Sequence, residues 1–450
     1  MAAVTLALTC TLAGSVRLSG AGRQGRVLRV ALVGDPQVDN PVEMGYARRS
    51  IYRELLGRRD VDLCIFLGDL VNDNMSLLPE SLSVIDSLPF RSFMVPGNHD
   101  RDVYHGSKSS GSMSRPRDLS TWRKSVGYVD TSFVRGNVRF IMMNNVRHAA
   151  AGMTDYVGGF TEKQKHWLDS VLVTDVTRGR KMSRGSVARS RRPSLGKVTP
   201  ALTILATHIP FSQMKGRDSV LALIPEQARM LYVSGHTHFI SRDNSIPEVI
   251  AGATCGSWWR GVKDSDGVPY ALQSCGAPRG YFVAEIRRDG DYTLRYRCVG
   301  RDDEVSVWGV REEGEIGADR LYINVFGGAP DGVVKVRGAR RWRITSRGDG
   351  VHDGSDTQGL SRKKRDLVCE RSAKTAPEVE QVIEFNASMS RDYRKSHRDE
   401  FIPLRRKPST HLWQTTDFVS GPLPVYVNVV YRDSHMRFRQ RVPLTVVNRH

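Results

Sequence analysis

Five apolar, strand-like runs in the first half of the chain each end in side chains able to bind a metal ion. The runs cover residues 27–33, 62–67, 93–95, 203–206 and 230–233. Between the first three runs, residues 46–56 and 77–88 have the periodicity of helices. Strand, polar loop and helix in repetition predict a parallel sheet with crossover connections. The carboxyl ends of such strands meet at one edge, where open α/β sheets place their ligands.

The residues at these strand ends combine carboxylates, amides and imidazoles. They are Asp35, Gln37, Asp69, Asn98, His99, His208, His236 and His238. This mixture suits first-row divalent ions better than a thiolate site would. The set is larger than one ion needs, so two ions about 3.5–4 Å apart could share one carboxylate. Asp69 is the natural bridge, because it follows the central strand. Each residue alone could be a turn residue, a helix cap or a loop histidine, but chance does not readily produce five such strand ends in succession.

The chain is long and basic. At 450 residues it predicts two or three domains, and its formal charge is +19 with a pI near 9.9. Such a surface attracts phosphate, anionic lipid or nucleic acid, although an arginine-rich solvated surface is an equally good explanation. Residues 177–197 hold eight Lys or Arg and no acid. They predict a solvated loop, with phosphate or lipid docking as the alternative.

The cysteines and the N-terminus bear on the cellular compartment. The six cysteines include no C-x-x-C pair, and Cys255 and Cys275 lie in two Gly-rich loops where a disulfide stays an open possibility. Residues 1–26 read as a degraded or misannotated export signal, with a disordered tail as the alternative. No run reaches the ~18 apolar residues of a spanning helix. We therefore expect a periplasmic, secreted or cell-surface protein without a transmembrane span.

The last third of the chain has a different pattern. Beyond residue 300 we expect no helices. The predicted strands cover residues 321–326, 332–336, 382–385, 424–431 and 436–447. Residues 301–450 therefore predict an all-β domain of sandwich type, following a first domain over residues 27–300, although the boundary could lie as early as residue 256. Trp342 and Trp413 are expected to anchor its core rather than to bind sugar. Whether this domain docks a partner or caps the first domain stays open.

Three local signals concern the middle of the chain. Residues 133–145 predict a hairpin turning at Gly136 and Asn137, and residues 280–296 predict a second hairpin. Thr161 and Gln164 have the spacing of a capping box at a helix start. Residues 106–120 are rich in Ser, Gly and Arg and predict a mobile loop beside the site.

Taken in order, the strand-end motifs resemble the calcineurin-like metallophosphoesterase family. The motifs are Asp-x-Gln, Gly-Asp-x-x-x-Asp, Gly-Asn-His-Asp, Thr-His-x-Pro and Gly-His-Thr-His, over residues 35–238. Residues 34–37, 252–259 and 411–413 further resemble a bacterial, mostly Bacteroidetes-type branch with a C-terminal β domain. The resemblance implies an α/β (α+β) fold, a four-layer α/β/β/α sandwich followed by the smaller all-β domain.

The resemblance also implies roles for the matching residues. The first ion would be held by Asp35, Gln37, Asp69 and His238, and the second by Asp69, Asn98, His208 and His236. His99 would contact the substrate phosphate and protonate the leaving group. Asp69 and His99 are thus the expected catalytic residues.

Two positions depart from the family pattern. Gln37 stands where most relatives have His, which favours manganese or magnesium over zinc or iron. Asn72 stands where many relatives have an Asp that orients the histidine corresponding to His99. Without that carboxylate the imidazolium form of His99 is less stabilised, so His99 becomes a weaker acid catalyst at neutral pH, unless Asp73 or Asp100 compensates. The sequence leaves both candidates open.

These observations predict a dinuclear metal-dependent phosphoesterase acting on a phosphomonoester or phosphodiester by attack of a metal-bridging hydroxide. The ions expected are two of Mn, Fe or Zn. The expected substrate is a small-molecule or membrane-associated phosphoester. Two alternatives are a nucleic-acid-directed phosphodiesterase, which is possible but not favoured, and a binding module with a vestigial metal site. The substrate and the oligomeric state are left open.

Overall fold

The computed structural model describes residues 27–102, 118–148, 156–173, 200–243, 245–270, 272–311, 318–337, 343–345, 366–420 and 423–447. The predicted export signal, the basic segment 177–197, Trp342 and most of the predicted loop 106–120 lie outside these residues.

Two sheets form the first part of the chain. One contains, in spatial order, β13 (Tyr292–Cys298), β12 (Gly280–Ile286), β1 (Leu28–Val33), β2 (Leu63–Phe66) and β3 (Arg91–Met94). The other contains β10 (Ile240–Asp243), β11 (Glu248–Ala251), β9 (Met230–Ser234), β8 (Leu202–Ala206), β5 (Val138–Met142) and β4 (Thr131–Arg135). Five strands precede predicted site residues. In the first sheet β1, β2 and β3 are parallel to one another, and in the second β8 and β9 are parallel. The carboxyl ends of these strands therefore lie at one edge of each sheet.

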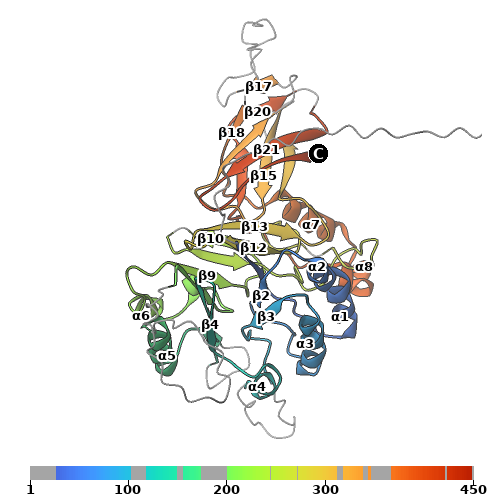
Figure 1. Cartoon of the computed structure of the whole chain (residues 1–450). Coiled ribbons are helices and arrows are strands. Elements are labelled where there is room, and N and C mark those ends of the chain that lie inside the picture. Colours follow the sequence, from blue (N-terminus) through green and yellow to red (C-terminus); the bar gives the residue numbers. More distant parts are fainter. Residues whose placement is uncertain are drawn as a thin grey trace, which may run out of the picture.

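Strand alternation builds three apolar layers. Val30 and Leu32 of β1 face the other sheet, whereas Ala31 and Val33 face helices. Helices α1 (Pro41–Ala47), α2 (Arg53–Gly57), α3 (Leu78–Asp86) and α4 (Ser120–Val126) cover the first sheet, and α5 (Glu162–Val173) and α6 (Arg217–Leu221) cover the second. Figure 1 shows these two helical groups on opposite flanks. The predicted four-layer α/β/β/α sandwich is confirmed.

Local signals in this part are largely confirmed. The β4–β5 hairpin turns at Gly136 and Asn137, and β12 and β13 form the second predicted hairpin. At the start of α5, the Gln164 backbone N–H donates to Thr161 Oγ1 at 3.2 Å, and Thr161 N–H donates to Gln164 Oε1 at 3.0 Å. A small two-stranded sheet, β6 (Val146–His148) with β7 (Tyr156–Gly158), lies between β5 and α5 in sequence.

The predicted helix over residues 46–56 begins earlier. Helix α1 starts at Pro41, because the Asn40 side chain accepts hydrogen bonds from the N–H groups of Val42 and Glu43. A π-helical turn, Arg48–Tyr52, connects it to α2.

The C-terminal part is a closed barrel of seven strands rather than two facing sheets. Its strands, in spatial order, are β14 (Val305–Arg311), β22 (Arg437–Val447), β21 (Tyr426–Arg432), β16 (Val333–Arg337), β18 (Asp366–Arg371), β19 (Leu412–Thr415) and β15 (Ala318–Val325). Pairing of β14 with β15 closes the ring, and β20 (Phe418–Ser420) and β17 (Arg343–Thr345) extend it. Trp413 is buried in the barrel core, as predicted.

The expectation that no helix follows residue 300 is wrong. Residues 382–385, predicted as a strand, lie within α7 (Pro377–Ser388), and α8 (Arg391–Ser396) follows. Four residues of Val-Ile-Glu-Phe fit a strand and a helix equally well. The helical signal is wider, because Val379, Val382 and Ile383 form one apolar face that packs on Leu272 and Leu404.

The barrel rests on the strand that follows the His-x-His motif. Arg242 of β10 and Asp433 of the β21–β22 turn form a buried ion pair, with Arg242 Nη1 2.5 Å from Asp433 Oδ2. The Thr410 hydroxyl donates to the carbonyl of Ile240 at 2.9 Å, and the rings of Tyr292 and His435 stack at 4.2 Å. Figure 1 shows the barrel standing on β10, β12 and β13.

The domain boundary at residue 300 stays a prediction. Among the described residues, no helix is long and apolar enough to span a bilayer.

Candidate metal centre

The strand-end residues gather in loops at the shared edge of the two sheets. Asp35, Gln37 and Asp69 follow β1 and β2, Asn98 follows β3, and His208 follows β8. These five side chains are buried, although each is polar or ionisable. Buried polar groups normally require partners. Their burial therefore indicates a built site rather than a set of solvated loop residues.

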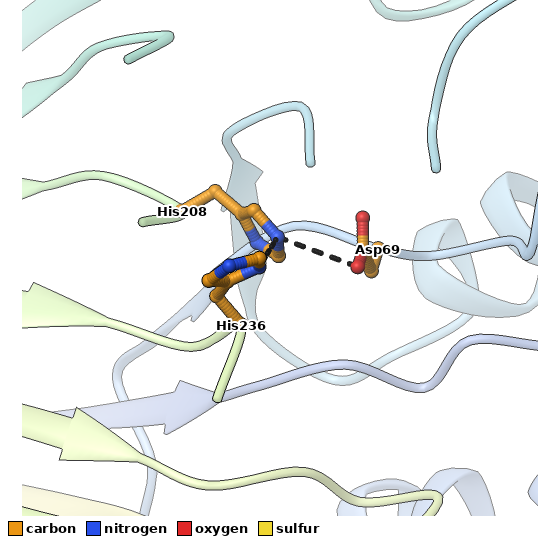
Figure 2. A group of neighbouring side chains, drawn as sticks. All are labelled: Asp69, His208 and His236. Atoms are coloured by element: carbon orange, nitrogen blue, oxygen red, sulfur yellow. Dashed lines mark hydrogen bonds and ion pairs between the residues drawn. The ribbon is translucent and has the colours of Figure 1, made fainter. Parts of the chain in front are cut away.

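Three of the four predicted ligands of the second ion surround one atom of the fourth, Nε2 of His208. This atom lies 2.9 Å from Asn98 Oδ1, 3.1 Å from His236 Nδ1 and 3.3 Å from Asp69 Oδ2. Figure 2 shows both imidazoles and the Asp69 carboxylate directed at one another. Among the described residues, Asp69, His208 and His236 form the group of His, Cys, Asp and Glu side chains able to hold an ion, with ligand atoms within 4.8 Å of one another.

The other ring nitrogen of His208 fixes which atom is available. Its Nδ1 lies 2.8 Å from the carbonyl oxygen of Leu67, so Nδ1 carries a proton and Nε2 is the nitrogen that can bind an ion once its own proton is lost. A backbone carbonyl on the distal nitrogen is a common way to orient a metal-binding histidine. His238 is oriented in the same way, because its Nδ1 lies 2.8 Å from the carbonyl oxygen of Gly256.

The remaining predicted ligands of the first ion lie in the same loops but form a looser set. Both carboxylate oxygens of Asp35 accept the backbone N–H of His236, at 3.0 and 2.9 Å. The Cys255 thiol lies 3.8 Å from Gln37 Oε1 and 3.8 Å from His238 Nδ1. Neither Asp35 nor His238 belongs to the group that contains Asp69, within the part of the chain described. The role of these residues in a first ion site stays a prediction.

Left-handed backbone concentrates at this site. Among the described residues, those other than glycine with positive φ are Asp35, Gln37, Asp69, Asp73, His236, His238, Trp258 and Trp259. Six of these were singled out from the sequence as ligands or their supports, and the two tryptophans lie in the adjacent loop. Side chains in this region of φ/ψ space are strained, with typical costs of about 1–3 kcal/mol each. Strain of this kind accumulates where residue geometry serves function.

Glycines before the ligands are required by close approach. A Cβ atom at Gly97 would overlap Oδ1 and the backbone nitrogen of Asp69, and one at Gly235 would overlap Oδ2 of Asp35. Each carboxylate therefore rests against the backbone of a neighbouring loop. The recurring Gly-Asp, Gly-Asn and Gly-His pairs in the sequence reflect this packing.

The structure distinguishes the three residues proposed to support the site. Asp73 Oδ1 lies 3.2 Å from His99 Nδ1, an ion-pair distance without the alignment of a good hydrogen bond. Asp100 instead accepts the backbone N–H groups of Val71 and Gly97, at 3.0 and 2.9 Å, and so fixes the turn. Asn72 Oδ1 accepts a hydrogen bond from Gln37 Nε2 at 3.4 Å, so Oε1, which is within 3.8 Å of the Cys255 thiol, is the Gln37 atom able to bind an ion.

The electrostatics of the site without an ion follow from burial and mutual charge. Burial alone would raise the pKa of Asp69, but the charge and hydrogen bond of His208 lower it below its usual range. Reciprocally, burial would lower the pKa of His208, but Asp69 raises it to about 9. Burial lowers the pKa of His236 to about 3 and that of His238 to about 4. These two imidazoles are therefore neutral and able to coordinate at neutral pH.

The residues fit a divalent ion. Burial raises the pKa of Asp35, so the buried carboxylates lack enough positive charge. Protonated His208 faces both of them, 3.3 Å from Asp69 and 3.9 Å from Asp35. A divalent cation would replace that proton and stabilise both carboxylates. Oxygen and imidazole ligands of this kind suit Mn, Fe or Zn.

The cysteines do not join the loops. Cys255 and Cys275 are both free and buried, and so are Cys64 and Cys298. Cys275 accepts a weak hydrogen bond from the backbone N–H of Ile240 at 3.5 Å. The possible Cys255–Cys275 disulfide is therefore not formed.

Sequence reasoning did not assign one residue of the site. The ring of Trp258 contacts two predicted site histidines, with centroid distances of 6.1 Å to His99 and 5.1 Å to His238. The Gly- and Trp-rich segment around it was visible in the sequence, but nothing there indicated which Trp faces the site.

Comparisons with known proteins agree with the fold. Residues 28–239 match the family described as "Calcineurin-like phosphoesterase", and residues 248–386 match "C terminal of Calcineurin-like phosphoesterase". No curated protein matched the sequence.

Two solved structures are similar at low identity. One is the purple acid phosphatase PPD1 from yellow lupin (Lupinus luteus) seeds, 15% identical with a TM-score of 0.36, covering 61% of this chain and 52% of the phosphatase. The other is the Haemophilus influenzae NAD nucleotidase NadN, 11% identical with a TM-score of 0.29, covering 60% of this chain and 49% of the nucleotidase. The chain thus spans about half the length of each. Such scores say nothing about its substrate.

The first family match covers most of the sandwich with its ligand-bearing loops, and the second covers the last sandwich strands, β11 to β13, together with β14 to β18 of the barrel part. The chain therefore belongs to the calcineurin-like metallophosphoesterases, a family of hydrolases, and carries the C-terminal domain of that family.

Proposed function

We propose that this protein is a dinuclear metal-dependent phosphoesterase that hydrolyses a phosphomonoester or phosphodiester. The observation that supports this most directly is the cluster around His208 Nε2, where ligand atoms of Asp69, Asn98 and His236 all lie within 3.3 Å. When bound, divalent ions supply a water of lowered pKa and neutralise charge on the phosphate.

The chain's own residues then bind and move protons. Asp69 would be the ligand that the two predicted sets share, because the resemblance assigns its carboxylate to both and it already lies 3.3 Å from His208 Nε2. His99 sits at the edge of the cluster with its side chain 22% exposed, so it can reach a substrate from solvent. Its imidazolium donates a proton to the leaving oxygen as the P–O bond breaks, and Asp73 keeps that imidazolium charged.

Manganese is the ion we favour. An amide oxygen from Gln37 is a harder ligand than the imidazole found in most relatives, and harder ligands favour Mn over Zn. The hydrogen bond from Gln37 Nε2 to Asn72 leaves the amide oxygen as the Gln37 atom able to bind an ion.

The test combines metal content, stability and turnover. Elemental analysis of the Mn-loaded protein should find two ions per chain, and added Mn should raise the melting temperature, because a ligand that binds only the folded state stabilises it. The loaded protein should hydrolyse nitrophenyl phosphate or bis-nitrophenyl phosphate. Asp69→Asn should abolish turnover and reduce the metal content, whereas Asp169→Asn, at an exposed position on α5, should change neither.

Outcomes separate the alternatives. Protein that binds less than one ion per chain would support a binding module with a vestigial site. Protein that binds two ions yet releases nothing from either ester, while Asp69→Asn behaves identically, would sink the proposal.

A second candidate is a nucleic-acid-directed phosphodiesterase, which one face of the barrel favours. Register places six basic side chains on the outer face of β16, β21 and β22: Lys335, Arg337, Arg432, Arg437, Arg439 and Arg441. Arg441 also covers the exposed ring of Tyr426 at 4.7 Å. A gel-shift titration across salt decides, since binding to phosphates gives a steep negative slope. Arg437→Glu with Arg441→Glu should weaken that binding if it occurs on this face.

Export to the periplasm, the medium or the cell surface also stays a proposal, because it rests on residues 1–26 alone. Fractionation of cells that express the full chain, followed by N-terminal sequencing of the mature protein, would test it. Full-length protein confined to the cytoplasm would contradict it.

A further inference from the structure

Two adjacent tryptophans beside the metal centre have opposite environments. Trp259 is 2% exposed and Trp258 is 39% exposed, and both have positive φ, at 48° and 67°. A bulky side chain in this region of φ/ψ space is unusual, and an exposed indole gives up the stabilisation of burial. Trp258 therefore bears two costs that its surroundings must offset.

Trp259 is an anchor. Its indole N–H donates to the carbonyl oxygen of Pro36 at 2.8 Å, within the loop that also carries Asp35 and Gln37. The ring packs on Tyr46 at 6.3 Å, and the Arg279 guanidinium lies 5.0 Å from its centroid. These contacts account for its burial without any ligand.

The loop over residues 252–261 is attached to the metal-binding loops along its backbone. Thr254 N–H donates to the Gly34 carbonyl at 2.9 Å, and Cys255 N–H donates to the Asp35 carbonyl at 3.1 Å. The Gly256 carbonyl accepts from His238, and the Ser257 hydroxyl donates to the Leu272 carbonyl. Together with the buried Trp259, these hydrogen bonds fix the indole of Trp258 beside His99 and His238.

The exposed indole adjoins the group that protonates the leaving oxygen. The ring of Trp258 meets that of His99 edge to face, at 6.1 Å and 89°, and lies 5.1 Å from that of His238. A leaving oxygen that accepts a proton from His99 must come within about 3 Å of it. The rest of the leaving alcohol must then pass close to the Trp258 indole.

We propose that Trp258 forms the wall of the leaving-group subsite and selects phosphoesters whose alcohol carries a flat aromatic ring. This inference rests on the proposed function and specifies its substrate class. The face of an indole stacks on any flat aromatic ring or base, whatever its substituents. It adds little binding energy for a small aliphatic alcohol. The aromatic ring could be an aryl group next to the phosphate or the base of a nucleotide.

Two matched substrate pairs separate these sources. Naphthyl phosphate against glycerol phosphate tests an aryl group, and adenosine monophosphate against ribose phosphate tests a base. In the Mn-loaded full chain, Trp258→Ala should raise KM for the aromatic member of the preferred pair about tenfold, with KM for the aliphatic member and kcat unchanged. Trp258→Phe should restore most of the preference. Phe385→Ala, at an exposed aromatic on α7, is the matched control and should change nothing.

Trp258→Gly guards against a folding defect, because glycine adopts a φ of 67° without strain. It should behave like the Ala variant in the assay and melt at no lower temperature. If Trp258 only supports His99 and His238, both members of each pair will lose activity equally and Phe will not restore a preference. That result, or no change in either variant, would overturn the inference.

A binding measurement keeps this test separate from the proposed function. Phenylphosphonate and methylphosphonate are not hydrolysed, and calorimetric titration into the Mn-loaded protein compares them directly. We expect the phenyl compound to bind more tightly and to lose about tenfold in affinity on Trp258→Ala, with methylphosphonate unaffected. If the protein shows this selectivity but cleaves no ester, the proposed function fails and the subsite stands. Equal binding of the two phosphonates in wild type overturns the subsite.

Discussion

The Nδ1 atom of His99 lies 3.2 Å from Oδ1 of Asp73, one residue beyond the position where relatives place the orienting carboxylate. Asp73 reaches His99 because its own backbone is left-handed, with φ of 59°, and because its N–H donates to the His99 carbonyl at 3.2 Å. Burial would lower the pKa of His99, but Asp73 and Asp69 raise it. Asp73, next to Asn72 in the chain, therefore supplies the carboxylate that stabilises protonated His99.

Replacing Asp73 by Asn should make the protein a poorer catalyst for esters with poor leaving groups. A raised pKa keeps His99 protonated to higher pH, so its loss moves the alkaline limb of the pH profile to lower pH. General acid catalysis typically contributes about 10²–10⁴ in rate. We expect kcat for glycerol phosphate at neutral pH to fall at least about tenfold. Turnover of nitrophenyl phosphate, whose leaving group needs no proton, should fall much less.

Asn72→Ala is the control for that experiment, because Asn72 contacts Gln37 and not His99 in the structure. It should leave the alkaline limb in place. An equal loss for both esters in Asp73→Asn, with an unmoved pH profile, would contradict the assignment.

Gln37→His should change which metal the protein prefers. The substitution returns an imidazole to the position where most relatives have one, and imidazole favours Zn and Fe over Mn. Competition between Mn and Zn, measured by elemental analysis after dialysis against both, should shift toward Zn. Asn72→Ala frees the Gln37 amide without changing its chemistry, and should loosen binding of either metal without reversing their order.

Breaking the ion pair between Arg242 and Asp433 should destabilise the whole chain. Both side chains are buried, at 3% and 0% exposure, so a partner left alone is an uncompensated charge. Arg242→Met should lower the free energy of unfolding by about 3–5 kcal/mol. Arg229→Met, in the exposed pair with Asp291, should cost less than about 1 kcal/mol. Denaturant unfolding of the wild type, Arg242→Met and Arg229→Met measures both values. Equal free energies of unfolding for the two variants would contradict a structural role of the buried ion pair.

His411 should make the protein sensitive to acid. Its ring is fully buried, neither nitrogen has a hydrogen-bond partner among the described residues, and burial lowers its pKa to about 3. The unfolded chain takes up a proton near pH 6.5 and the folded chain does not, so stability falls as pH drops from about 6.5 toward 3. This loss amounts to about 1.4 kcal/mol per pH unit.

His411→Leu should remove that part of the pH dependence. The slope of unfolding free energy against pH, measured by urea titration, should flatten between about pH 6 and pH 4 relative to wild type. His397→Leu, at an exposed histidine of the α8 end, is the control and should leave the slope unchanged. An unchanged slope in His411→Leu would mean that the ring is protonated in the folded state.

The catalytic half was predictable because its signals are local. Each apolar run followed by Gly and a ligand residue predicts one strand and one loop, and parallel order brings their ends together. The cluster around His208 follows from that arrangement. The choice between Asp73 and Asp100 was not predictable, since it depends on a single left-handed residue.

The C-terminal half was less predictable because its order comes from distant pairings. The barrel also depends on the pairing of Val307 in β14 with Leu444 in β22, which run parallel and lie more than a hundred residues apart in the chain. No local pattern specifies that contact. Within the same half, part of α7 was mistaken for a strand because the three apolar residues of its Val-Ile-Glu-Phe stretch were read without their neighbours at helical spacing.

The glycines behind the carboxylates divide the site into replaceable and irreplaceable positions. At positions 37 and 72, where the family resemblance leads us to expect His and Asp, this chain has Gln37 and Asn72, and Gln37 Nε2 lies 3.4 Å from Asn72 Oδ1. Gly97 and Gly235 allow no such exchange, because any side chain there would occupy the space of Asp69 or Asp35. Over evolution, the chemistry of such a centre can drift toward new metals and leaving groups, whereas the backbone that presents it cannot.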